Sequence, residues 1–326
     1  MVIETTQVSE FVELANVQRE PERRPMIGTA FVLTKMILSH PKAFTAYRKM
    51  RPGEQRYVRP PRGYELPPFR DDMRYCTSKE KYLRPTRYCN PREHAVVAMA
   101  NELGAYELSE YEFADAAYWF VKDNIHFEMR AMDSAATTLR RGTGSCFHYI
   151  NLFVALCRAA GIKARYKIFA INYDRVQQQP IDPLWDGMYN AMGSLAAEAE
   201  AEVHIDGSWL VGHPAVSAEL QAAKDVPITK LGEDQIGVFF DAIPGTIKRS
   251  ESIPIGFGWG ARMFFRLMPG SPERVSVRYL NAAVRGRQII EEAGGREAYD
   301  RNARMKWGLS TSVTGLKEDE ALVFED

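Results

Sequence analysis

The sequence predicts an α+β fold in which helices come first and an antiparallel hairpin follows. Between residues 90 and 161, apolar residues recur at helical spacing, and capping residues mark where the segments start and stop. From residue 197 on, small or apolar residues alternate strictly with glutamates as far as an Asp-Gly pair. That pattern is typical of a strand that leads into a tight hairpin turn.

The first 90 residues are expected to precede the core of the fold. Residues 1 to about 50 have helical character, with an apolar face formed by Phe31, Leu33, Met36 and Ile37. From Arg51 to Asn90, prolines and arginines interrupt any periodic pattern. We therefore expect a linker or an arm that wraps around the domain there.

Two helices are predicted by their capping residues. Asn90 can cap a helix that begins at once and ends at Gly104, a residue type suited to a helix C-terminus. Ser109 and Glu112 have the spacing of a capping box, which predicts a second helix running to Asn124. Both segments carry the apolar periodicity that a buried helix face needs.

A third helix is expected to begin near Cys146 and to stop at Gly161. It presents one apolar stripe, formed by Ile150, Phe153, Val154 and Cys157. Residues 164–170 then combine β-branched and aromatic side chains, which predicts a buried strand. Towards the C-terminus, residues 256–270 suggest an aromatic, glycine-rich loop and residues 280–295 a final helix.

The hairpin around residues 197–213 is specified in detail. One face carries Ala197, Ala199, Ala201, Val203 and Ile205, and the other carries Glu198, Glu200, Glu202 and His204. Asp206 and Gly207 supply the two-residue turn, so that residue 205 pairs with residue 208. Counting outward from that pair sets Glu200 opposite His213 on the same face.

Composition limits the classes of partner and compartment. The chain has 326 residues, with 42 basic and 42 acidic side chains, so its overall charge favours neither nucleic acid nor an anionic membrane. The most apolar early segment, MIGTAFVLTKMIL, is too short to span a bilayer. We expect a small-molecule substrate and a cytoplasmic protein. The four cysteines, Cys76, Cys89, Cys146 and Cys157, form neither a CxxC pair nor a disulfide framework.

Cys146 is the candidate nucleophile. It follows a Gly-Thr-Gly-Ser turn and opens an apolar helix, where the helix dipole and free backbone N–H groups favour a thiolate and an oxyanion. A buried, unreactive cysteine is the alternative interpretation. His148 lies two residues further along the helix and is expected to point away from the thiol, and His204 is expected to lie exposed beside the turn.

Four blocks in this order resemble the transglutaminase-like superfamily, a branch of the papain-like cysteine enzymes: ADAAYWFVKDNIHF, GTGSC, LFVALCRAAGIKAR and EVHIDGSWLV. The resemblance implies a helix that carries the cysteine and packs on an antiparallel sheet. It places the core in residues 86–250, after a helical extension and arm in residues 1–85. Residues 251–326 are then a loop and helix elaboration.

The resemblance also implies an exchange of residues at the site. The histidine of the family falls on Glu198, and its aspartate falls on His213. We expect Cys146 as nucleophile and His213 with Glu198 or Glu200 as the acid–base pair of a hydrolase or acyltransferase for a small acyl, amide or thioester-type substrate. A carboxylate beside sulfur raises the pKa of the thiol, so the exchange also favours acid–base chemistry.

Other functions stay open at this point. The same pocket could serve a lyase, an isomerase or a cyclase, with a protonated Glu198 as general acid or its carboxylate as base on the substrate. The resemblance turns the glutamate face towards Cys146, and Glu198, Glu200, Glu202, His204 and His213 are ligand types for zinc or iron. A non-catalytic binding protein that keeps the fold is the third possibility.

Overall fold

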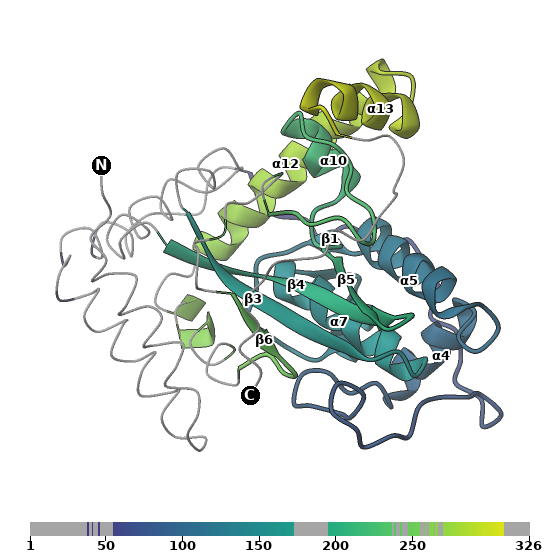
Figure 1. The fold of residues 1–326 in the computed structure, drawn as a ribbon. Helices are drawn as coiled ribbons and strands as arrows, with labels where there is room; N and C mark the ends of the chain where they lie inside the picture. The colour runs from purple at the N-terminus through teal and green to yellow at the C-terminus, as the bar shows by residue number, and fades with distance from the viewer. Residues whose placement is uncertain are drawn as a thin grey trace.

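The computed structural model describes residues 55–172 and 195–236, most of residues 238–309, and Leu38, Pro41 and Thr45 near the N-terminus. The helix predicted over residues 1–50 therefore lies almost wholly outside the described residues. The described part of the chain forms a sheet with helices packed on it (Figure 1). The expected α+β class is confirmed.

Within residues 55–172, four helices precede the strands of the main sheet: α4 (His94–Glu102), α5 (Glu110–Asn124), α6 (Ala135–Arg141) and α7 (Cys146–Ala159). The capping box of α5 is confirmed, with the Glu112 amide 3.3 Å from Ser109 Oγ and the Ser109 amide 3.0 Å from the Glu112 carboxylate. The predicted start of α4 at Asn90 is wrong. Asn90 Oδ1 instead accepts from the Arg92 amide at 3.1 Å, and Glu93 is extended, so the helix begins at His94.

The main sheet has four strands in the order β5-β4-β3-β6, and every neighbouring pair is antiparallel. The strands are β3 (Ala164–Asn172), β4 (Leu195–Ile205), β5 (Ser208–Gly212) and β6 (Lys248–Ser250). The predicted hairpin is confirmed: Ile205 pairs with Ser208, and Asp206 and Gly207 both have positive φ, at 50° and 81°. Those angles are the ones that a two-residue hairpin turn requires.

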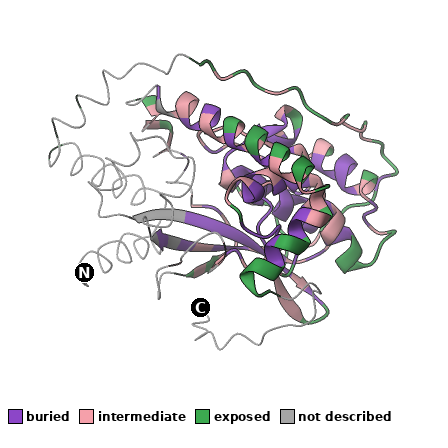
Figure 2. Ribbon diagram, turned by 90° about the horizontal axis from the view of Figure 1, so that it is seen from above, coloured by how far each residue is buried: buried purple, intermediate pink, exposed green. Residues whose placement is uncertain are grey.

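Helix α7 is the centre of the core. Every residue from Phe147 to Ala159 is buried, because the sheet covers one side of the helix and α4, α5 and α6 cover the others (Figures 1 and 2). The alanine face of β4, seen at Ala199 and Ala201, belongs to the same apolar cluster. Small side chains on that strand let the helix approach closely.

A short pair of parallel strands holds the turn before α7 in place. Strand β1 (His126–Phe127) pairs with β2 (Thr143–Gly144), so that Phe127 lies opposite Gly144. The Glu128 amide extends the ladder by donating to the Gly144 carbonyl at 2.9 Å. Gly144, two residues before the first residue of the helix, is thus tied to the segment around residue 127.

The C-terminal region contains more helix than predicted. Helix α12 (Ser271–Glu292) starts well before residue 280, and α13 (Arg296–Trp307) follows it after Gly294 and Gly295, both with positive φ. Helix α12 packs along α10 (Ala218–Ala223) and reaches β1. In the described ranges, no helix combines the length and the apolar character needed to cross a membrane.

Gly286 is where α12 and α10 approach most closely. A Cβ atom at this position would overlap the carbonyl oxygen of Glu219 in α10. We expect Gly286→Ala to lower the free energy of unfolding by about 1–3 kcal/mol, because backbone must move to admit the methyl group. An ordinary helical glycine would instead gain about 1 kcal/mol from the same change. Urea unfolding measures the difference.

Gly63→Ala is the matched control for that prediction. Gly63 is exposed, and its nearest neighbour would be the Asn124 side chain at 3.9 Å. We expect a change within about 0.5 kcal/mol there. Equal effects at the two glycines would contradict the close contact between α10 and α12.

Candidate active site

Cys146 is the first residue of α7 and is half-buried. The backbone amides of Cys146 and Phe147 lie close enough to hydrogen-bond to the sulfur, as expected at the open end of a helix. Cys157, on the same helix, is completely buried in the apolar cluster. The two cysteines of α7 therefore sit in different surroundings, and only Cys146 has polar neighbours of the kind that reactive thiols have.

Glu198 and His213 lie beside Cys146. Glu198 comes from β4, and its carboxyl group is within hydrogen-bonding reach of the thiol. His213 follows Gly212, the last residue of β5, and its Nε2 lies 3.8 Å from Glu198 Oε1. Both side chains are buried. The hairpin thus brings a carboxyl group to the start of α7, with an imidazole next to that carboxyl group.

The thiol is neutral in the resting site. Burial raises the pKa of Cys146 well above its usual value, and the charge and hydrogen bond of Glu198 raise it further. The two helix amides act in the opposite direction but do not compensate. At neutral pH the group facing Glu198 is therefore a thiol and not a thiolate.

Glu200 has a different environment. It is fully buried, its carboxylate lies 3.1 Å from Lys167 Nζ, and its Oε1 accepts from the Gln235 amide at 3.0 Å. Burial and the nearby charge of Asp234 raise the pKa of Glu200 to about 7, against the attraction of Lys167 and His213. These contacts join β4 to β3 and to the segment around residue 235.

The glutamates of β4 have different partners. Glu202 Oε2 is 2.6 Å from Arg165 and 3.0 Å from Arg249. With Glu200 paired to Lys167 as well, two of the expected metal ligands already have cationic partners. Within the part of the chain that the structure describes, no three His, Cys, Asp or Glu side chains are arranged to hold a metal ion.

The arrangement of helix, sheet and hairpin agrees with a family-model match. Residues 97–214 match the model described as the transglutaminase-like superfamily. These residues form a transglutaminase-like domain. The matched range begins within α4, includes Cys146 and the hairpin, and ends directly after His213.

One solved structure similar to the chain is described as a "Putative Cysteine Protease from Cytophaga hutchinsonii". The two chains are 20% identical with a TM-score of 0.32, and the match covers 52% of this chain and 49% of the other. The chain thus spans about half the length of that neighbour, and so distant a match does not define a reaction. None of the curated proteins matches the chain.

Segments outside the transglutaminase-like domain also reach the site. Tyr279 of α12 stacks on Phe127 with ring centroids 3.7 Å apart, next to the ladder that precedes Cys146. Burial raises the pKa of Tyr279, and so do the charges of Cys146 and Glu198, which places the phenol within electrostatic reach of both. Tyr57 of the N-terminal arm donates to the Phe127 carbonyl at 3.2 Å.

Sequence reasoning missed these two tyrosines. Neither belongs to a motif, and Tyr279 is more than 100 residues from the cysteine, so no spacing argument could have found it. It also missed Lys167 and Asp234, whose Nζ and Oδ2 lie 2.6 Å apart beside Glu200. Only strand register brings Lys167 opposite Glu200.

Glu198→Gln tests the electrostatics of the site. The substitution keeps the shape of the side chain but removes the negative charge beside the sulfur, so the pKa of Cys146 should fall. At a pH below that pKa, each unit of decrease gives about tenfold more thiolate. We expect iodoacetamide to alkylate Cys146 at least about tenfold faster at pH 7.5 in the variant, measured by mass spectrometry of the peptide that contains Cys146.

Glu107→Gln is the control, because Glu107 lies between α4 and α5 and touches no residue named at the site. Its alkylation rate should equal that of the unaltered protein. A slower reaction in Glu198→Gln would mean that the carboxylate activates the ground-state thiol, contrary to the electrostatics described above.

Proposed function

We propose that the protein is a cysteine-dependent enzyme that acts on a small acyl, amide or thioester-type substrate, with Cys146 as the nucleophile. The observation that carries the proposal is the placement of a carboxyl group and an imidazole, Glu198 and His213, beside a thiol at the open end of a helix. A transglutaminase-like domain supports the same class of chemistry.

In the proposed first step, Glu198 takes the thiol proton as the sulfur of Cys146 attacks the substrate carbonyl carbon. Proton transfer during attack suits a thiol whose pKa is too high for a stable thiolate. The amides of Cys146 and Phe147, which lie near the sulfur, would donate to the oxygen of the tetrahedral intermediate. The leaving amine or thiol then takes the proton from Glu198, and a thioester remains on Cys146.

In the second step, water or an acceptor amine attacks the thioester. Glu198 removes a proton from the attacking group and returns it to the departing sulfur, which restores the thiol. His213 lies 3.8 Å from Glu198 and would act on this carboxylate by holding it and balancing its charge. In this division of roles the carboxyl group, and not the imidazole, exchanges the proton with sulfur.

Acylation by p-nitrophenyl acetate tests the proposal. We expect intact-protein mass spectrometry to show one added acetyl group, carried by the peptide that contains Cys146, and a burst of p-nitrophenol equal to the protein concentration. Cys146→Ser should abolish the burst, and His213→Ala should slow it by about 100-fold or more, the usual range for a group in general acid–base catalysis.

Cys76→Ser is the matched control, because Cys76 is also half-buried but lies before α4, away from the hairpin. It should acylate as the unaltered protein does. If the acetyl group appeared on a residue other than Cys146, or did not appear at all, the nucleophilic role would be refuted.

The neutral thiol next to a carboxylate favours a second candidate, a non-hydrolytic lyase, isomerase or cyclase. Such a pair offers a proton donor and a proton acceptor on one substrate without a covalent intermediate. Exchange of a substrate carbon-bound proton with deuterated solvent, in a sample that forms no acyl-enzyme, would distinguish this chemistry. Absence of both signals would favour a binding protein.

A further inference from the structure

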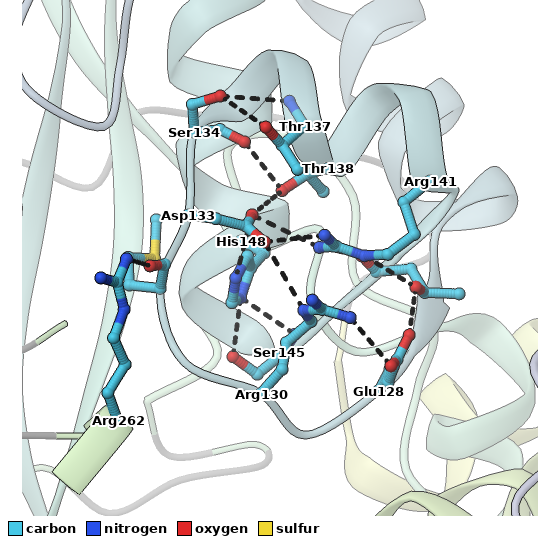
Figure 3. A network of polar contacts seen from close by, with 12 residues as sticks. Glu128, Arg130, Asp133, Ser134, Thr137, Thr138, Arg141, Ser145, His148 and Arg262 are labelled. Carbon is cyan, nitrogen blue, oxygen red and sulfur yellow. Dashed lines mark hydrogen bonds and ion pairs between the residues drawn. The ribbon is translucent and has the colours of Figure 1, made fainter. Parts of the chain in front are cut away.

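A polar network surrounds Ser145 and His148 at the start of α7 (Figure 3). The His148 ring is completely buried on the first turn of α7, and its Nδ1 lies 3.2 Å from the Ser145 amide nitrogen and 2.9 Å from Ser145 Oγ. Its Nε2 faces Asp133 Oδ1 at 3.4 Å. The sequence predicts only that His148 points away from the thiol. The contacts show that the ring lies between the Ser145 backbone and the Asp133 carboxylate.

The geometry assigns the protons on the ring. A backbone N–H can only donate, so the Nδ1 that faces the Ser145 amide must be unprotonated. The single proton of a neutral imidazole then sits on Nε2, which lies 3.4 Å from Asp133 Oδ1 without the alignment of a hydrogen bond. Burial lowers the pKa of His148 although Asp133 opposes the shift, so the neutral form prevails at pH 7.

The residues before the thiol are held in place by this ring and its partners. A Cβ atom at Gly144 would overlap the His148 side chain, so the ring lies directly against the backbone of the turn. Arg141 connects Asp133 to the same turn, with NH1 2.7 Å from Asp133 Oδ2 and NH2 2.7 Å from the Thr143 carbonyl. Three consecutive residues, Thr143, Gly144 and Ser145, are thus fixed through one histidine and one ion pair.

We infer that His148 is a positioning residue that fixes the start of α7, and with it Cys146, by accepting the Ser145 amide proton at an unprotonated Nδ1, with the Asp133 carboxylate beside Nε2. The position is the one that glutamate or glutamine occupies in a capping box. The consequence for catalysis rests on the proposed function of Cys146, but the positioning itself does not.

The choice of histidine has a physical reason. A glutamate in this place would add a second negative charge next to a thiol whose pKa is already high. A neutral imidazole accepts the same amide proton without that charge. The arrangement is also sensitive to acid, because a proton on Nδ1 would place two donors face to face at the turn.

The charged groups around the ring are Asp133, Arg141 and Arg130. Burial raises the pKa of Asp133, but the contacts with His148 and Arg141 lower it more, so the pKa lies well below its usual value. Asp133 therefore stays ionised throughout the range in which a histidine titrates. Because the folded protein binds the His148 proton less readily than the unfolded chain, this group makes the protein less stable as the pH falls below about 6.5.

Long-range proton–nitrogen NMR of imidazole-labelled protein tests the proton assignment directly. We expect the His148 ring at pH 7 to be neutral, with its proton on Nε2 and a bare Nδ1. His148→Gln identifies the signal. A proton on Nδ1 at pH 7, or a doubly protonated ring, would overturn the inference whatever Cys146 does.

Alkylation of Cys146 by iodoacetamide at pH 8 tests the positioning. In His148→Leu the freed turn should expose the thiol and move it away from Glu198, so the rate should rise by about tenfold or more. In His148→Gln, which keeps an acceptor that does not titrate, the rate should stay within about threefold of the unaltered protein. His94→Gln, an exposed histidine stacked on Phe69, is the matched control.

Two outcomes separate this inference from the proposed function. An unaltered alkylation rate in folded His148→Leu would refute the positioning role. If His148→Leu does not fold, His148→Gln decides the question. This variant should lose less stability than the unaltered protein between pH 7 and pH 5. An equal loss would refute the positioning role of His148. A protein with the predicted tautomer whose Cys146 is never acylated would refute the proposed function alone.

Discussion

The contact between the Glu198 carboxyl group and the Cys146 thiol is the one on which the proposed chemistry of this protein depends. A carboxylate raises the pKa of a neighbouring thiol, whereas an imidazolium would lower it. The proposed mechanism therefore differs at its first step from one that starts from a thiolate–imidazolium pair. In this mechanism proton transfer accompanies attack, and the free energy of that transfer depends on how well Glu198 and His213 are held.

The packing of α7 and of the hairpin maintains this contact. Helix α7 is enclosed by the sheet and three other helices, so its first residue can move only if the turn before it moves. The hairpin that carries Glu198 and His213 is fixed against the same helix by its alanine face. The contact between Glu198 and Cys146 thus joins β4 to the start of α7, and the packing of the core sets the geometry of this contact.

Buried charges on β4 show how the fold uses cations to hold the sheet. Glu200 with Lys167, and Glu202 with Arg165 and Arg249, connect β4 to β3 and β6 across the face opposite α7. Removing one member of such a pair leaves the other charge buried without a partner, which is usually costly. The glutamate row therefore divides into an acid at the thiol and acids that join strands.

Local chemistry by itself predicted α5, α7 and the hairpin register, and it singled out Cys146 as the candidate nucleophile. The capping box at Ser109, the alternation from residue 197 and the Asp-Gly turn are short-range signals, and each acts on backbone within a few residues. Counting from the turn also placed Glu200 across from His213, because side chains in a strand alternate with a fixed period of two.

Tertiary structure alone decided which acid meets the thiol. Glu198 and Glu200 lie on one face of the strand and are the same residue type, so the sequence could not show which of them has which role. The pairing of β3 with β4 brings Lys167 opposite Glu200, and this ion pair distinguishes Glu200 from Glu198. Tyr279 and Asp133 reach the neighbourhood of Cys146 only through packing of α12 and of the turn before α6. Contacts between residues far apart in the chain leave no periodic pattern in the sequence, and they exist only once the core has formed.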